Sequence, residues 1–242
     1  MLDLEKQRWE QNIIGNLTKP RAYPAAVSLE NIGTYLIGGM PSSKGSTDFL
    51  AEGSTEWTTG PEIPVDMSQP CVVKISNQSF IVLYKTDILE YEVDIRDPTS
   101  SNGWQSSSKW PNLQTSRERQ PGCSKIENLV VIAGGYRRSQ KSGESLVSTE
   151  VLDLLTKRIE YAGDLNTPRV WFHMTTLIRG GQQLILAFGG SAVSSSLNSV
   201  EQFNSNNNTW SLAPTSMAEA RHAFGAVAVL PTMMSCPPTR EG

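Results

Sequence analysis

The sequence has few of the residues that catalytic and metal sites require. It contains only two histidines, His173 and His222, and three cysteines, none of them in a Cys-x-x-Cys spacing. A serine or cysteine hydrolase needs a partnered histidine and a local signature, and a zinc site needs clustered ligands. The lysine spacing of a phosphate-binding loop is also missing. These absences argue against an enzyme and predict neither a metal nor another cofactor.

The chain also lacks an excess of positive charge and a long apolar run. Its net charge of -3 gives no sign of the basic patch that binds nucleic acid or an anionic membrane. The N-terminus, MLDLEKQRWEQ, has no signal-peptide stretch, and no run of about 18 apolar residues could span a membrane. As given, the chain is expected to be cytoplasmic. Three Asn-x-Ser/Thr tripeptides, at Asn16, Asn77 and Asn207, would matter only if an upstream segment sent the protein outside the cell.

Glycine and proline are plentiful, with 19 and 14 residues, and they separate short apolar runs. Three of these runs end in a glycine pair: YLIGG at 35–39, VVIAGG at 130–135 and LILAFGG at 184–190. Their length and their content of valine, isoleucine and leucine indicate strands rather than helices. The chain therefore contains an internal repeat, with a period of about 50 residues.

The clearest copy of the repeat runs from Arg169 to Arg221. It predicts a strand over 173–178, the turn RGGQQ, the strand LILAFGG, the loop SAVSSSL and a strand over 198–204, followed by Trp210. The other copies share the glycine pair, the tryptophan and the opening arginine. The glycines are Gly38, Gly39, Gly134, Gly135, Gly189 and Gly190; the tryptophans are Trp9, Trp57, Trp104 and Trp210; the arginines are Arg21, Arg117 or Arg119, Arg169 and Arg221.

This recurring pattern resembles the kelch motif, whose units form the four-stranded blades of a β-propeller. The resemblance implies an all-β, kelch-type propeller over residues 1–230, with 231–242 as a disordered tail. It implies four complete blades and partial blade strands at both termini. Glycine allows close backbone approach and positive φ where a strand ends. By the same resemblance, each arginine is expected to connect successive blades, and each tryptophan to pack between them.

Two units depart from the pattern. Unit two, roughly 69–116, has Leu83-Tyr84-Lys85 in place of the glycine pair, and Gln69 or Ser68 in place of the arginine. Unit three has Ile159 and Tyr161 where tryptophan is expected.

The two ends of the chain each supply part of a blade. The N-terminal segment is interpreted as third and fourth strands, and 220–230 as a first strand, without a candidate for the second. Either the ring closes with a three-stranded blade, or the chain is a fragment, which we favour. Cys71, Cys123 and Cys236 cannot pair completely, so free thiols are expected, with Cys71 and Cys123 buried in first strands.

Partner contacts are expected in the loops between second and third strands, because the strands themselves are committed to packing. These loops run from Met40 to Thr47, from Gly135 to Ser148 and from Gly190 to Leu197. The candidate partner-binding residues are Tyr136, Arg137, Arg138 and Lys141 in the middle loop, with Ser194 and Ser195 in the third. An aromatic residue beside several cations suits an acidic segment of a protein partner.

Three functions remain open from the sequence. The first is a substrate-recognition scaffold of a cullin-type ubiquitin ligase adaptor, and the second is an actin-associated or extracellular structural scaffold. The third and most remote is a propeller enzyme with a carboxylate pair on the central axis.

Overall fold

The computed structural model describes residues 14–40, 45–138, 142–192 and 195–228, and the backbone of two short strands near the N-terminus. These residues form antiparallel β-sheets and two short 3-10 helices, which confirms the predicted all-β class. None of the helices in this part of the chain is long and apolar enough to cross a membrane.

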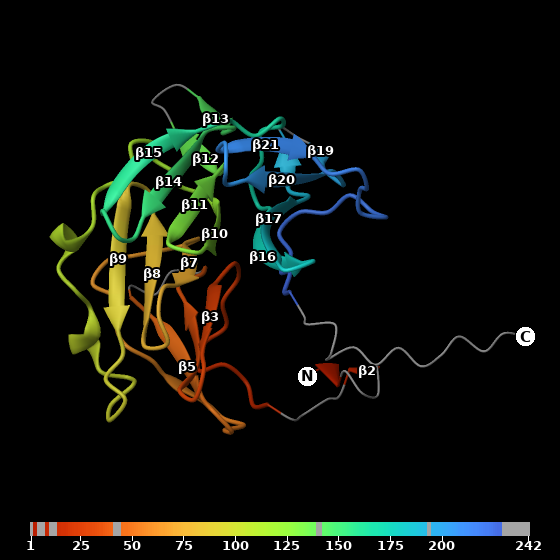
Figure 1. Ribbon diagram of the computed structural model, residues 1–242. Coiled ribbons are helices and arrows are strands. Elements are labelled where there is room, and N and C mark those ends of the chain that lie inside the picture. The colour runs from red at the N-terminus through yellow and green to blue at the C-terminus, as the bar shows by residue number, and fades with distance from the viewer. Residues whose placement is uncertain are drawn as a thin grey trace, which may run out of the picture.

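Four sheets follow one another along the chain, each built as an antiparallel meander (Figure 1). The first contains β3 (Ala25–Leu29), β4 (Gly33–Ile37), β5 (Thr47–Ala51) and β6 (Trp57–Thr59). The second contains β7 (Cys71–Lys74), β8 (Ser79–Tyr84) and β9 (Asp87–Glu92), followed by the 3-10 helices η1 (Ser101–Gly103) and η2 (Ser107–Lys109). The third contains β10 (Gly122–Ile126), β11 (Leu129–Ala133), β14 (Thr149–Asp153) and β15 (Arg158–Ala162). The fourth contains β16 (His173–Arg179), β17 (Gln182–Phe188), β20 (Val200–Asn204) and β21 (Thr209–Leu212).

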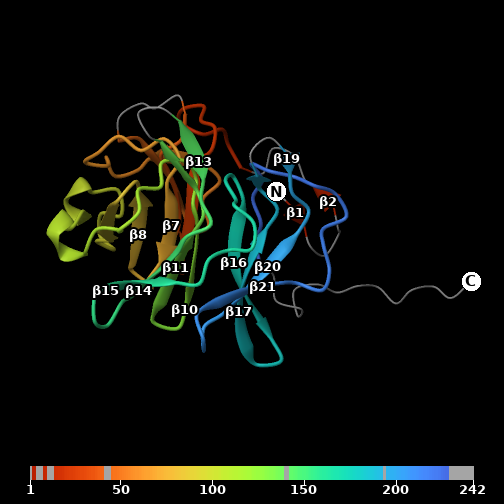
Figure 2. The same cartoon turned by 90° about the horizontal axis from the view of Figure 1, so that it is seen from above.

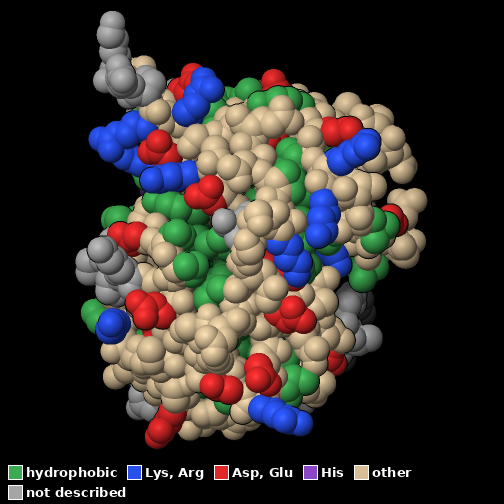
Figure 3. Space-filling view, turned by 90° about the vertical axis from the view of Figure 1, so that its left-hand side faces the viewer, with side chains coloured by type: hydrophobic (Ala, Val, Ile, Leu, Met, Phe, Trp, Pro, Cys, Tyr) green, Lys and Arg blue, Asp and Glu red, His purple; other side chains and the backbone are tan. Residues whose placement is uncertain are grey.

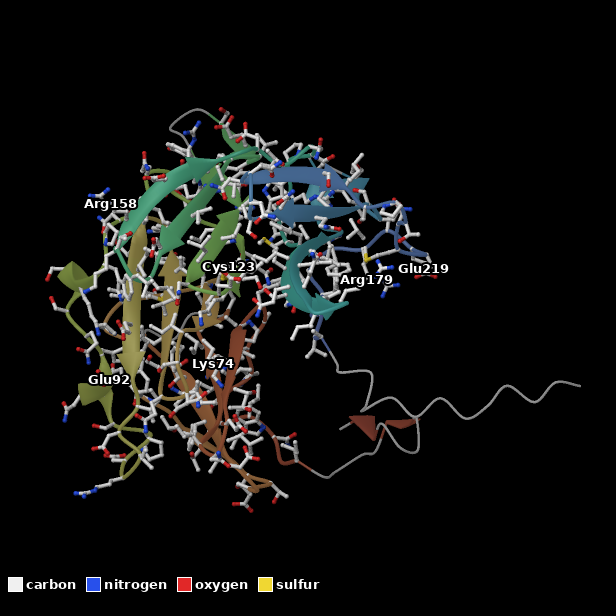
Figure 4. The ribbon with its side chains drawn as sticks, viewed as in Figure 1. Lys74, Glu92, Cys123, Arg158, Arg179 and Glu219 are labelled. Atoms are coloured by element: carbon white, nitrogen blue, oxygen red, sulfur yellow. A yellow bond between two sulfur atoms is a disulfide. The ribbon has the colours of Figure 1, made fainter. Side chains whose placement is uncertain are left out.

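The sheets are arranged like propeller blades, with the first strand of each on the inside. Strand β3 contacts β7, β7 contacts β10, and β10 contacts β16. No contact of similar extent joins β16 to β3 in the described part of the chain, and the sheets form an open arc in Figure 1. Lys74 and Cys123, on two of the first strands, lie towards the inside of this arc (Figure 4).

The core lies between successive sheets. Tyr35 of the first sheet packs against Phe80 and Tyr91 of the second, with ring centroids 5.3 and 5.8 Å apart. Trp210 of the fourth sheet is buried and donates its indole N–H to Thr149 Oγ1 of the third sheet at 2.9 Å. Each blade therefore depends on its neighbour for burial of its large side chains.

A buried arginine side chain holds together each of three sheets, and two of these arginines, Arg117 and Arg169, also bond to the sheet before. The Nη1 group of Arg169 donates to the carbonyls of Gly189 at 2.7 Å and Ser199 at 3.1 Å, and Nη2 lies 2.9 Å from Glu201 Oε1. The carbonyl of Arg169 accepts from Gly135 N of the preceding sheet at 2.8 Å. Arg117 repeats the side-chain pattern with Gly134, Ser148 and Glu150, and Arg21 repeats it with Gly38, Ser46 and Asp48.

The second sheet has other residues at the glycine and arginine positions of the repeat. Lys85 has a φ of +55°, close to the +60° of Gly134, and its N–H donates to the carbonyl of Arg117 at 3.2 Å. The buried Glu90 accepts from the Trp110 indole N–H at 2.8 Å and pairs with Lys109 at 2.9 Å. This unit therefore keeps a positive-φ residue after its second strand and a hydrogen bond to the next unit, without the glycines or the arginine of the repeat.

The second sheet has three strands, whereas four complete four-stranded blades were predicted. Trp104, expected to follow a third strand, forms only an isolated bridge to Tyr91. The physical reason is serine capping. The side chains of Ser100 and Ser106 each accept a backbone N–H at the start of a 3-10 helix, which turns the chain away from the sheet.

The predicted C-terminal first strand is not formed in the described residues up to 228. A strand needs a neighbour for its N–H and C=O groups, and the sequence offers no second strand there. At the N-terminus, β1 (Leu2–Asp3) pairs with β2 (Arg8–Trp9). The predicted tail, 231–242, lies outside the described residues.

The expectation of free thiols at Cys71 and Cys123 is wrong, because the two cysteines form a disulfide. They lie on β7 and β10, the adjacent first strands of the second and third sheets, with Cα atoms 6.1 Å apart. The neighbouring blades bring equivalent positions of the repeat within disulfide distance. Cys236 lies outside the described residues.

Candidate functional site

The two ends of the blades differ in shape, and two names distinguish them. The loop face carries the connections between second and third strands and the segments that enter each first strand. It includes the hairpins β12 (Tyr136–Arg138) with β13 (Gly143–Ser145), and β18 (Ser191–Ala192) with β19 (Ser195–Ser196). The turn face carries the tight turns between first and second strands and between third and fourth strands. Figure 2 shows the two hairpins at one end of the molecule and these turns at the other.

Hairpin β12–β13 displays three of the candidate binding residues. Tyr136 is half-buried, whereas Arg137 and Arg138 are exposed. Arg137 forms an ion pair with Glu144 across the hairpin. Because exposed ion pairs contribute little, Arg137 remains available to a partner. Lys141 lies outside the described residues.

Hairpin β18–β19 carries the remaining candidates. Ser195 is exposed, and its hydroxyl donates to the Ala192 carbonyl at 3.3 Å. The neighbouring Ser196 hydroxyl lies 2.8 Å from His222 Nδ1. Ser194 lies outside the described residues.

An aromatic and arginine cluster, formed by Arg119, Tyr136, Trp171 and His222, connects the two hairpins. The Arg119 guanidinium lies 4.7 Å from the centre of the Tyr136 ring and 6.0 Å from that of Trp171. The rings of Trp171 and His222 are 5.9 Å apart. The Trp171 indole N–H donates to Gln69 Oε1, which belongs to the second unit, at 3.3 Å. The cluster therefore joins parts of three units at the loop face.

The backbone beneath the cluster is strained. Trp171 has a φ of +55°, a conformation that bulky residues rarely adopt. Tyr23 and Ala223, each two residues after a repeat arginine, have φ values of +57° and +55°. Such strain persists where the surrounding structure holds it, and it concentrates at functional sites.

Sequence reasoning missed Trp171, treated His222 as a core or turn residue and considered Arg119 only as a repeat residue. A signal was present, because Tyr23, Arg119, Trp171 and Ala223 each follow a repeat arginine by two positions. This position lies on the loop face in every unit that has the arginine.

The other predicted repeat residues are placed as follows. Trp57 and Trp104 are half-buried, Trp210 is buried, and only the backbone of Trp9 is described. Arg221 is exposed, and its side chain pairs with Glu219 at 3.4 Å rather than entering a sheet. In unit three, Ile159 pairs with Leu152 as Trp210 pairs with Phe203, so Ile159 occupies the tryptophan position.

The buried ion pairs of the arginines belong to the framework of the sheets. Burial lowers the pKa of the Arg169 guanidinium, and the nearby Glu201 carboxylate opposes that shift. Burial also lowers the pKa of His173. Strands β3, β7, β10 and β16 contain no aspartate or glutamate, so they offer no carboxylate pair for the axis. No group of three or more potential metal ligands occurs among the residues described.

Comparison with known protein families finds a Kelch motif at residues 181–217. The match covers the turn after β16, strands β17 to β21 and the segment that follows, which is the unit with the clearest repeat pattern. No curated protein matches the chain. Kelch motifs generally mediate interactions between proteins. The Kelch motif at residues 181–217, together with the recurring arginines and glycine pairs, supports a kelch-repeat protein.

Proposed function

We propose that the chain is a non-enzymatic scaffold that binds a protein partner through its loop face. The observation that carries this proposal is the cluster of Arg119, Tyr136 and Trp171, in which a cation and two aromatic rings from different units meet. Aromatic residues and arginine contribute most of the binding energy in many protein interfaces. The framework holds these side chains in place before a partner arrives, which lowers the entropy cost of binding.

The charge on the loop face favours an acidic partner segment. Arg119 and Arg138 are exposed, and the Arg137 charge is only partly offset by Glu144. Guanidinium groups bind carboxylates in a two-point geometry, and the rings beside them provide apolar contact. By comparison, the side of the molecule shown in Figure 3 has acidic and basic side chains interspersed over its surface.

Reversing two charges on the loop face is expected to weaken partner binding about ten- to a hundredfold without unfolding the protein. The variant is Arg119→Glu with Arg138→Glu, and affinity for the captured partner is measured by surface plasmon resonance. Binding by the wild type should also weaken as salt concentration rises.

A matched control uses two exposed arginines on the turn face, Arg158 and Arg179, which are labelled in Figure 4. The variant Arg158→Glu with Arg179→Glu makes the same change in net charge and should bind the partner as the wild type does. If both variants lose affinity equally, overall charge controls binding. If the loop-face variant binds normally, the proposed site is wrong.

Among the scaffold roles, an extracellular structural role is favoured by one observation. Cys71 and Cys123 form a disulfide, and such bonds are rare in the reducing cytosol, where a cullin-type ligase adaptor would work. The identity of the captured partner separates the roles. An extracellular or cell-surface partner supports the structural role, whereas a cullin complex supports the adaptor role.

A further inference from the structure

The three Asn-x-Ser/Thr tripeptides each present an exposed asparagine. Asn77 lies in the turn between β7 and β8, and Asn207 in the turn between β20 and β21. Asn16 follows Gly15, whose N–H donates at 2.7 Å to Thr55 O in the turn between β5 and β6. All three asparagines are exposed.

Two of these positions, Asn77 and Asn207, lie on the turn face. In an antiparallel meander, the turn after the first strand and the turn after the third strand fall at the same end of the sheet. Asn77 occupies a turn of the first kind, and Asn207 occupies one of the second kind. Gly15 attaches Asn16 to a turn of the second kind. The tripeptides at Asn77 and Asn207 therefore lie on the turn face, at the end of the sheets opposite the hairpins of the loop face (Figure 2), whereas Asn16 lies in the segment that enters β3.

The local geometry at Asn207 suits modification. The hydroxyl of Thr209, the third residue of the tripeptide, donates to Asn207 Oδ1 at 2.8 Å. The side chain of Asn207 projects from a four-residue turn in which Asn206 and Asn208 are also exposed. A bulky glycan at this position would extend into solvent without disturbing the sheet.

The disulfide between Cys71 and Cys123 is a second and independent observation. Disulfides form and persist in the secretory pathway and outside the cell, and the secretory pathway is also where asparagine receives glycans. In the reducing cytosol disulfides are rare, and asparagine does not receive N-linked glycans there.

We propose that Asn16, Asn77 and Asn207 carry N-linked glycans, those at Asn77 and Asn207 on the turn face, and that the protein matures in an oxidising compartment where Cys71 and Cys123 are joined. In glycosylation, the asparagine amide nitrogen bonds to C1 of an oligosaccharide held on a lipid diphosphate. The C1–oxygen bond breaks, the lipid diphosphate leaves, and the amide loses one proton. In disulfide formation, the two thiols give two protons and two electrons to the disulfide of an oxidoreductase, which becomes a dithiol.

This inference replaces the cytoplasmic location expected from the sequence, and it does not depend on which partner binds. It also assigns different roles to the two faces. Glycans on Asn77 and Asn207 cover the turn face, and the hairpins of the loop face stay open for a protein.

The test is a peptide map of the endogenous protein, captured with an antibody. Treatment with peptide N-glycosidase in heavy-oxygen water should convert Asn16, Asn77 and Asn207 to aspartate that carries the heavy isotope. Without reduction, the peptides that contain Cys71 and Cys123 should be recovered as one linked species. Unmodified asparagine at all three positions would overturn the glycan assignment, and free thiols at both cysteines would overturn the oxidising compartment.

Variants of the full-length protein in its own cell type assign each glycan. Asn77→Gln and Asn207→Gln should each remove one glycan step on a denaturing gel. Asn206→Gln, an exposed asparagine in the same turn but outside any tripeptide, should leave the migration unchanged. Migration of Asn77→Gln and Asn207→Gln identical to the wild type would contradict the proposal at those positions.

Discussion

Replacing Arg169 with alanine is expected to lower the free energy of unfolding by about 3–5 kcal/mol, because Glu201 would remain buried without its cation. The side chains of Arg169 and Glu201 are both fully buried. The carbonyls of Gly189 and Ser199 would also lose their donor, and an unsatisfied buried acceptor adds to the cost. Urea unfolding followed by tryptophan fluorescence measures the change.

Arg221 provides the matched control, because it holds the same place in the repeat but is 50% exposed. Arg221→Ala should change stability by no more than about 0.5 kcal/mol. If Arg169→Ala were as stable as Arg221→Ala, the buried arginine would not hold the fourth sheet together.

The variant Gly134→Val is expected to lose about 2–5 kcal/mol, because valine meets both an unfavourable φ and a crowded site. Gly134 has a φ of +60°, and a Cβ atom there would lie 2.6 Å from the Arg169 carbonyl oxygen and 2.8 Å from the Phe172 ring. The valine side chain could avoid this crowding only if the third sheet moved away from the fourth.

Gly180 isolates the effect of backbone conformation. Its φ is +58°, but a Cβ atom there would meet nothing within 4 Å. Gly180→Val should therefore cost only about 1–2 kcal/mol, the penalty of the left-handed conformation. Equal losses for the two variants would show that close contact between blades at Gly134 contributes nothing. Thermal or urea unfolding distinguishes the results.

The repeat could be predicted from the sequence because its signals are local. A glycine pair at a strand end and an arginine before the next strand recur in order, and a Kelch motif is found at 181–217. The second sheet was harder to predict, because Lys85 adopts the left-handed conformation without being glycine. Its missing fourth strand depends on two serine caps, which are weak signals in a chain rich in serine.

The candidate site was only partly predictable. Tyr136, Arg137 and Arg138 are adjacent in the sequence, so their composition was visible. Arg119, Trp171 and His222 come from separate segments and meet only when the sheets pack side by side. The disulfide was missed for the same reason, because Cys71 and Cys123 are 52 residues apart and become neighbours only through the contact of β7 with β10.

The most direct test of the loop face as the binding surface is hydrogen–deuterium exchange on the complex with the captured partner. The account predicts that partner binding slows exchange in residues 117–120, 136–138 and 169–171, while residues 76–79 and 205–208 on the turn face exchange as in the free protein. Slower exchange confined to the turn face, with no change on the loop face, would contradict it.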